Sequence, residues 1–246
     1  MPRVHVVSDV HARADAFICL GDLVLFLDYD EPSGGIFADM FGTDAALRLI
    51  ELRTARRFDE AREFSGELWA SVGRDRYEVI EEAIRGQYAD LFAAMPTPAY
   101  LTYGNVDVPR LYADYLREDM TVLDGETVDI GGRRFGFVGG GLRTPMRTPY
   151  EISDEDYAAK VAALGPVDVL CAHIPPNVPE LLYDVGARRM ERGSDAIVEA
   201  IHEHQPELVL FGHVHNPLAR RTRIGRTECV NVGHFRGRGT PYVLEW

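Results

Sequence analysis

The sequence predicts an α/β protein with mixed β-sheets, and two observations support this. Short runs of apolar and β-branched residues alternate with longer helix-like segments over most of the chain, as expected for strands that pair in a sheet covered by helices. Two hairpin signals, at Gly131-Gly132 and near Gly225, add antiparallel strands. The length of 246 residues suits one large domain, or a core with a sizeable insertion.

Six runs have strand composition: residues 3–8, 17–20, 99–103, 134–138, 167–172 and 207–211. The two turns create two hairpins: 126–130 with 133–138, and 218–224 with 227–232. Residues 242–245 provide a last strand.

Helices are predicted over residues 154–164, 178–190 and 194–204, and Ser194 is a good N-cap for the last of these. Residues from about 44 to 95 are rich in Arg, Glu and Ala, with apolar residues at helical spacing. This pattern predicts two or three helices inserted between strands. No linker or repeat divides the chain, so we expect one domain, 1–246, with a helical insertion at about 44–95.

Composition limits the classes of protein. No apolar run approaches the ~20 residues that cross a bilayer, and the N-terminus has the pattern of a first strand instead of a signal peptide. Cys19, Cys171 and Cys229 lie far apart in apolar runs, so we expect buried thiols in a cytoplasmic protein. The net charge of −13 argues against a nucleic acid or an anionic membrane as the main partner. The sequence does not predict an oligomeric state.

Five short motifs place potential metal ligands just after strand-like runs. They are Ser8-Asp9-Val10-His11, Gly21-Asp22, Gly104-Asn105-Val106-Asp107, Ala172-His173 and Gly212-His213-Val214-His215. Loops at the carboxyl ends of strands are where α/β proteins build their sites. Two of the motifs carry ligand pairs at i, i+2, and in extended backbone such side chains point to one side.

The donor types indicate a pair of metal ions. Four imidazoles, two carboxylates and one amide oxygen suit Mn, Fe, Zn or Ni better than Ca or Mg. Seven side chains exceed what one tetrahedral ion uses. They suit two ions about 3.5–4 Å apart. Such a site keeps a positive charge that can hold a phosphoryl group.

In these motifs the chain resembles the calcineurin-like metallophosphoesterase family, because they occur in family order over nearly the whole chain. The resemblance implies a two-sheet β sandwich flanked by helices, and attack on phosphorus by a metal-bound hydroxide. It implies one metal held by Asp9, His11, Asp22 and His215. The other metal would be held by Asn105, His173, His213 and the same, bridging Asp22.

Two departures from the family pattern leave an alternative open. Val106 stands where the family commonly has a histidine, so the general acid is missing, and the following Asp107 is a candidate for a catalytic or orienting role. Only ten residues separate His11 from Asp22, which is short for a parallel crossover with a helix. Besides the enzyme, the sequence therefore allows a non-catalytic scaffold that binds a protein partner.

The leading hypothesis is hydrolysis of a small-molecule phosphomonoester or phosphodiester. Arg143 and His234 are candidates for contacts with the substrate, since arginine suits phosphate and His234 follows a late strand. A nuclease is a further possibility, because two-metal sites also cut nucleic acids. The acidic balance and the lack of a basic-aromatic track weigh against it.

Overall fold

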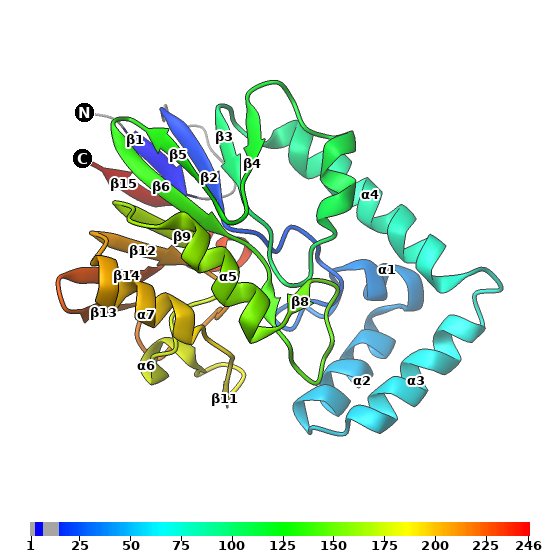
Figure 1. The fold of residues 1–246 in the computed structure, drawn as a ribbon. Coiled ribbons are helices and arrows are strands. Elements are labelled where there is room, and N and C mark those ends of the chain that lie inside the picture. Colours follow the sequence, from blue (N-terminus) through cyan, green and yellow to red (C-terminus); the bar gives the residue numbers. More distant parts are fainter. Residues whose placement is uncertain (1–2, 7–14) are drawn as a thin grey trace. The chain divides into compact units, whose positions relative to one another are not determined.

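The structure is a computed structural model that describes the backbone of residues 3–6 and all of residues 15–246 (Figure 1). The chain divides into two compact units. The sheet unit comprises Met1–Leu23 and Ala94–Trp246, and the helical unit comprises Val24–Ala93. Organisation as one domain with an insertion stays a prediction, but the helices of this region begin at Ile36, earlier than expected.

The first sheet of the sheet unit has the order β15-β1-β2-β3-β4. Its strands are β1 (Arg3–Val6), β2 (Ala16–Cys19), β3 (Ala99–Leu101), β4 (Met120–Val122) and β15 (Tyr242–Glu245). Strands β1 to β4 pair in parallel, whereas β15 runs antiparallel to β1. The first and last strands therefore lie side by side (Figure 1).

The second sheet has the order β13-β14-β12-β9-β6-β5. Its strands are β5 (Glu126–Ile130), β6 (Arg133–Val138), β9 (Val169–Ala172), β12 (Leu208–Phe211), β13 (Arg221–Ile224) and β14 (Thr227–Asn231). The four central strands are parallel. Each predicted hairpin forms an antiparallel edge, β5 with β6 and β13 with β14. The predicted hairpins and mixed sheets are confirmed.

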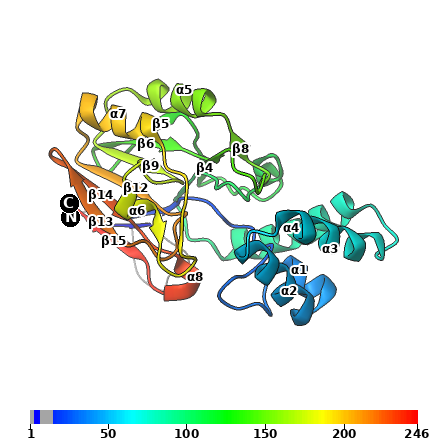
Figure 2. The same cartoon turned by 90° about the horizontal axis from the view of Figure 1, so that it is seen from below.

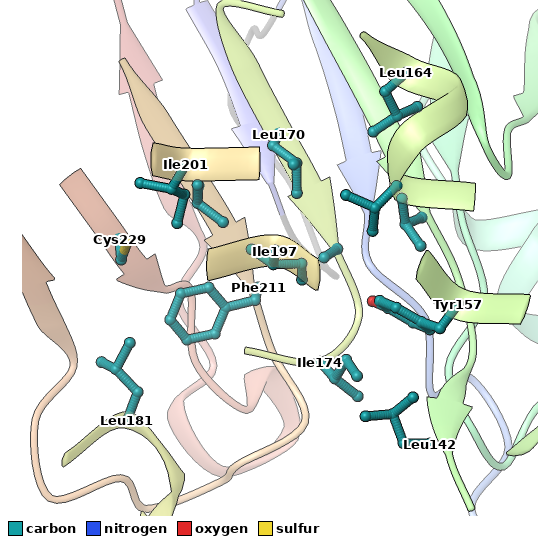
Figure 3. Packing of buried hydrophobic residues seen from close by; sticks show 14 residues of the cluster. Leu142, Tyr157, Leu164, Leu170, Ile174, Leu181, Ile197, Ile201, Phe211 and Cys229 are labelled. Atoms are coloured by element: carbon teal, nitrogen blue, oxygen red, sulfur yellow. The ribbon is translucent and has the colours of Figure 1, made fainter. Parts of the chain in front are cut away.

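Alternating side chains of the second sheet pack into two hydrophobic cores, one between the two sheets and one beneath the covering helices. On β9, Val169 and Cys171 pack between the two sheets, while Leu170 and Ala172 face helices. The covering helices are α5 (Asp154–Leu164) and α7 (Asp195–His204); Figure 3 shows their side chains against the sheet. Complete burial of an apolar side chain stabilises by about 1.5–3 kcal/mol. The predicted mixed α/β fold with helices flanking the sheets is confirmed.

Helix α5 has its predicted bounds, and Ser194 caps α7 as predicted by accepting a hydrogen bond from the Ile197 amide at 3.2 Å. The predicted helix over 178–190 is wrong. Only α6 (Pro179–Leu182) is helical, and two short strands follow: β10 (Tyr183–Asp184) and β11 (Arg189–Met190). The Asp184 carboxylate accepts from the amides of Gly186 and Ala187, both at 2.8 Å. This side-chain turn competes with the helix.

Short elements connect the larger ones. They are the 3-10 helix η1 (Pro109–Asp114), β7 (Gly141–Leu142), β8 (Glu151–Ile152) and α8 (Phe235–Arg238). Strands β7 and β8 pair in parallel and form a small separate sheet.

The helical unit contains four helices, labelled in Figure 2. They are α1 (Ile36–Phe41), α2 (Thr43–Thr54), α3 (Phe58–Ala70) and α4 (Arg76–Ala94). The prediction of two or three helices missed α1, which a single residue, Gly42 at φ 84°, separates from α2. Phe37, Leu49 and Trp69 belong to the unit's own core.

Candidate metal centre

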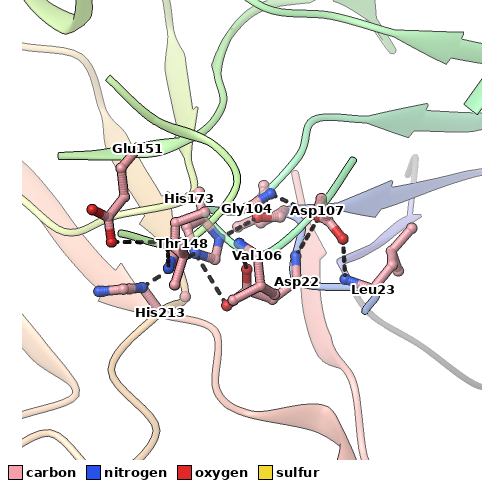
Figure 4. Close-up of polar contacts among 12 residues, drawn as sticks. Asp22, Leu23, Gly104, Val106, Asp107, Thr148, Glu151, His173 and His213 are labelled. Atoms are coloured by element: carbon pink, nitrogen blue, oxygen red, sulfur yellow. Dashed lines mark hydrogen bonds and ion pairs between the residues drawn. The ribbon is translucent and has the colours of Figure 1, made fainter. Parts of the chain in front are cut away.

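Four of the predicted ligands follow the carboxyl ends of parallel strands. Asp22 follows β2, Asn105 follows β3, His173 directly follows β9 and His213 follows β12. Strands β2 and β3 belong to the first sheet and β9 and β12 to the second, and parallel strands bring such ends to one edge of each sheet. The four side chains lie together, as Figure 4 shows for the three that it labels, Asp22, His173 and His213.

The Nε2 atom of His173 is the centre of this group. It lies 3.1 Å from Asn105 Oδ1, 3.3 Å from Asp22 Oδ2 and 3.2 Å from His213 Nδ1. The His173 side chain is buried. An N–H at His173 Nε2 could form a good hydrogen bond with only one of these three neighbours. The cluster therefore contains more acceptor atoms than protons available for hydrogen bonds.

These separations fit a shared cation. Ligand atoms about 2.0–2.2 Å from one ion, at tetrahedral or octahedral angles, lie about 2.8–3.6 Å apart. His173 also donates its Nδ1–H to the carbonyl oxygen of Leu20 at 2.8 Å. In a neutral imidazole this bond leaves Nε2 as the lone-pair atom, which is the usual arrangement of a metal-ligating histidine.

Asp22 and His213 are held in the forms that bind metals, whereas His173 is shifted toward its protonated form. Burial raises the pKa of the Asp22 carboxyl. The hydrogen bond from His173 and the charges of His173 and His213 outweigh burial, so the pKa lies below its usual range. Burial lowers the pKa of His173, but Asp22 outweighs it and the net shift is upward. Burial and His173 lower the pKa of His213 to about 3. A neutral His213 and an ionised Asp22 are the forms that bind metals.

The motifs Gly21-Asp22 and Gly104-Asn105 begin with glycine because their backbones pack closely together. A Cβ on Gly21 would lie 2.0 Å from the backbone nitrogen of Gly104. A Cβ on Gly104 would lie 1.9 Å from Asp22 Oδ1. The two backbones therefore touch where only glycine fits. Asp22 and His213 themselves adopt left-handed conformations, at φ 58° and 64°, which are uncommon outside glycine and concentrate at functional sites.

Asp107 holds the backbone beneath the site. Its carboxylate accepts hydrogen bonds from the amides of Asp22, Leu23 and Gly104 at 2.7–2.8 Å (Figure 4). The side chain is completely buried. Burial and the charge of Asp22 raise its pKa, against the hydrogen bond from Gly104. These contacts support a positioning role for Asp107, instead of contact with the substrate.

A second chain of hydrogen bonds orients Asn105. Its Nδ2 donates to Thr148 Oγ1 at 2.8 Å, so its Oδ1 turns toward His173. Thr148 in turn donates to Glu151 Oε1 at 2.8 Å. Glu151 also accepts from the Thr144 hydroxyl at 2.6 Å and from the Thr144 amide at 2.7 Å. Thr148 and Glu151 were not predicted as site residues, because no local pattern in the sequence marks them.

Within the described part of the chain, the cluster of Asp22, His173 and His213 does not include the remaining predicted residues. Asp9, His11 and residues 12–14 of the short crossover lie outside the described residues. The ring of His215 stacks on that of His234, with centroids 3.9 Å apart and planes at 10°. Arg143 is exposed, and its carbonyl accepts from Arg192 at 3.0 Å. Contact of Arg143 or His234 with a substrate stays a prediction.

The fold and the cluster define a candidate metal centre at the strand ends of an α/β sandwich. The chain matches the calcineurin-like phosphoesterases over residues 2–217, and it belongs to this family. The family is generally one of metal-dependent phosphoesterases, and the cluster of Asp22, His173 and His213 is compatible with that chemistry.

Solved structures are similar to this chain at low identity. One crystal structure is 17% identical, with a TM-score of 0.54, over 91% of this chain and 81% of its own. The crystal structure of TT1561 of Thermus thermophilus is 20% identical, with a TM-score of 0.46, over 61% of this chain and 70% of its own. No curated protein matches the chain. Among the residues described here, no helix has the length and apolar character needed to span a membrane.

Proposed function

We propose that this protein hydrolyses a small-molecule phosphomonoester or phosphodiester with two divalent cations drawn from Mn, Fe, Zn and Ni. The observation that carries the proposal is the convergence of three donor atoms within 3.1–3.3 Å of His173 Nε2. Membership of the calcineurin-like phosphoesterases supports the same reaction class.

In this proposal the seven ligands divide between two sites. Asp22, Asn105, His173 and His213 would hold one cation. Asp9, His11 and His215 would hold the other, with Asp22 bridging. When bound, the cations would supply Lewis acidity and an activated water for attack at phosphorus.

The chain's own residues orient this centre. Asp107 holds the backbone that carries Asp22 through amide hydrogen bonds. The carbonyl of Leu20 fixes the ring of His173, and Thr148 fixes the amide of Asn105. Outer partners of this kind are worth about 10–100-fold in metal affinity or activity.

Val106 limits the choice of substrate. Its backbone amide donates to Asp22 Oδ1 at 3.3 Å, but an aliphatic side chain cannot protonate a leaving group. General acid catalysis is worth about 10²–10⁴-fold. We therefore expect aryl phosphates, which leave as weakly basic phenolates, to react faster than alkyl phosphates.

The test is hydrolysis of aryl phosphate monoesters and diesters by protein loaded with Mn²⁺ or Zn²⁺. Asp22→Ala and His213→Ala should abolish turnover, whereas His202→Ala, an exposed histidine on α7, should leave it unchanged. Equal activity in all four proteins would show that the turnover came from a contaminant.

The absence of an acid at Val106 also favours a second candidate, a non-catalytic scaffold that binds a protein partner. Elemental analysis separates the two. About two metals per chain, lost in Asp22→Ala, supports the enzyme. No metal in a protein that keeps its full thermal stability supports the scaffold.

A further inference from the structure

An arginine-lined pocket of about 220 Å³ lies at the carboxyl end of β14, in the sheet unit. Its polar lining comes from Arg220, Arg221, Asn231, Arg238, Thr240 and Tyr242. None of these residues is a predicted metal ligand. The volume is below the range of about 300–1,000 Å³ for pockets that hold drug-sized ligands, so it suits one small group.

The positive charge of this pocket is only partly balanced. Arg221 pairs with Glu228 at 2.8 Å and lies beside the ring of Tyr242. Arg220 and Arg238 form no ion pair with any carboxylate in the described part of the chain. In a protein of net charge −13, two arginines at one pocket with no carboxylate partner among the described residues point to an anionic ligand.

The guanidinium group of Arg238 contains a buried donor that lacks a partner among the described residues. Its Nη2 is shielded from solvent and has no hydrogen-bond partner among the residues that the structure describes. Burial and the charge of Arg220 lower its pKa. A Cβ on Gly233 would lie 2.6 Å from Arg238 Nη1, so the guanidinium rests against a glycine that leaves room for it. A buried, unsatisfied donor is costly and calls for a partner.

The pocket shares a residue with the turn that carries His213. Asn231, which lines the pocket, donates from Nδ2 to the carbonyls of Gly212 at 3.2 Å and Val214 at 2.9 Å. Its Oδ1 accepts from the Gly233 amide at 2.9 Å. One asparagine therefore joins the wall of the pocket to the candidate metal centre.

We propose that Arg220, Arg221 and Arg238 form a binding pocket for a phosphoryl group, separate from the metal ligands. The planar guanidinium groups suit the tetrahedral oxygens of phosphate. The group has two possible sources, a second phosphoryl group of the substrate or a free phosphate ion. Only the first source rests on the function proposed above.

The binding test uses metal-free protein in EDTA, with phosphate and diphosphate as probes in titration calorimetry. Arg220→Ala and Arg238→Ala should each weaken binding by tenfold or more. The matched control is Arg223→Ala, an exposed arginine on the same strand as Arg221 but outside the pocket. Thermal unfolding checks the fold of each variant, and Arg220 is exposed, so its loss cannot disturb the core.

Two results would overturn the proposal. One is that the folded wild-type protein binds neither probe. The other is that Arg220→Ala and Arg238→Ala bind as well as Arg223→Ala. Asp22→Ala should still bind phosphate in EDTA, so failure of the pocket and failure of the metal centre are distinguishable.

Kinetics identify the source of the phosphoryl group. If it belongs to the substrate, Arg238→Ala raises KM for a bisphosphorylated substrate and leaves KM for an aryl monophosphate unchanged. If it is free phosphate, the wild-type kcat for the monophosphate ester responds to added phosphate, and Arg238→Ala abolishes the response. If the protein hydrolyses none of these substrates, the calorimetric titration still tests whether the pocket binds phosphate.

Discussion

His173 donates its Nδ1–H to the carbonyl oxygen of Leu20 at 2.8 Å, although 153 positions separate the two residues in the chain. The bond joins the end of β9 in one sheet to the segment that follows β2 in the other. It fixes the ring so that Nε2 meets Asn105, Asp22 and His213. The packing of the two sheets therefore orients the His173 imidazole toward the other three ligand side chains.

Metal binding should release a proton from His173. Because Asp22 raises the pKa of His173 above its ordinary value despite burial, Nε2 is protonated in metal-free protein at about pH 6. A cation must displace this proton, so affinity rises with pH by about tenfold per unit and levels off above the raised pKa. Calorimetry in two buffers with different ionisation enthalpies counts the released protons. An affinity that stays constant between about pH 5.5 and 7.5 would contradict this.

Gly104→Ala should abolish metal binding. The new Cβ would lie 1.9 Å from Asp22 Oδ1 and 2.6 Å from the Asp22 backbone nitrogen, so the Asp22 turn must move. Equilibrium dialysis with Mn²⁺ or Zn²⁺ measures the loss. Gly86→Ala is the control, because nothing lies within 4 Å of its Cβ on α4, and removing a helix glycine should stabilise by about 1 kcal/mol. Wild-type affinity in Gly104→Ala would refute the close contact.

Asp107→Asn should weaken metal binding and destabilise the fold. An amide can accept with only one oxygen, whereas the carboxylate accepts from three backbone amides through both. Each buried donor left unsatisfied costs about 1–3 kcal/mol. Chemical denaturation in EDTA measures the stability, and dialysis measures the metal affinity. Asp129→Asn, at an exposed position of the β5–β6 hairpin, should change neither.

Glu151→Gln should lower metal affinity without unfolding the protein. Glu151 accepts three hydrogen bonds, from the Thr144 amide and from the hydroxyls of Thr144 and Thr148. Glutamine keeps one acceptor oxygen, but its NH2 group would face at least one of these donors and could not accept from it. Asn105 then loses its fixed orientation, and affinity should fall about 10–100-fold. Titration with Mn²⁺ tests this beside Glu155→Gln, which changes an exposed residue of α5 in the same way. Equal affinities would show that Thr148 orients Asn105 unaided.

The three thiols should resist alkylation in the native protein. All three cysteines are buried, and burial raises the pKa of Cys19 and Cys229 to about 12 and that of Cys171 even further above its ordinary value. The thiolate, which is the reactive form, is then scarce at about pH 8. Mass spectrometry after iodoacetamide treatment should show unlabelled native protein and three labels in denaturant. Rapid native labelling would disprove the burial.

The pattern of residues predicted much of the fold because strands, hairpins and caps depend on near neighbours. The turn at Gly131-Gly132, the bounds of α5 and the cap at Ser194 each depend on a few adjacent residues. Prediction failed at 178–190, where one side chain, Asp184, favours a turn over the helix. Helical spacing in that segment carries no sign of this competition.

The sequence by itself determined the order of the ligand motifs and the strands that each one follows. Only the tertiary structure decided which atoms meet. The Asp107 bonds to the 22–23 backbone, the close approach of Gly21 to Gly104, and the Asn105–Thr148–Glu151 chain depend on the order of strands in the sheets. Strand order is a property of long-range packing, since pairing joins segments that are distant in the chain. Local residue patterns therefore do not reveal these contacts.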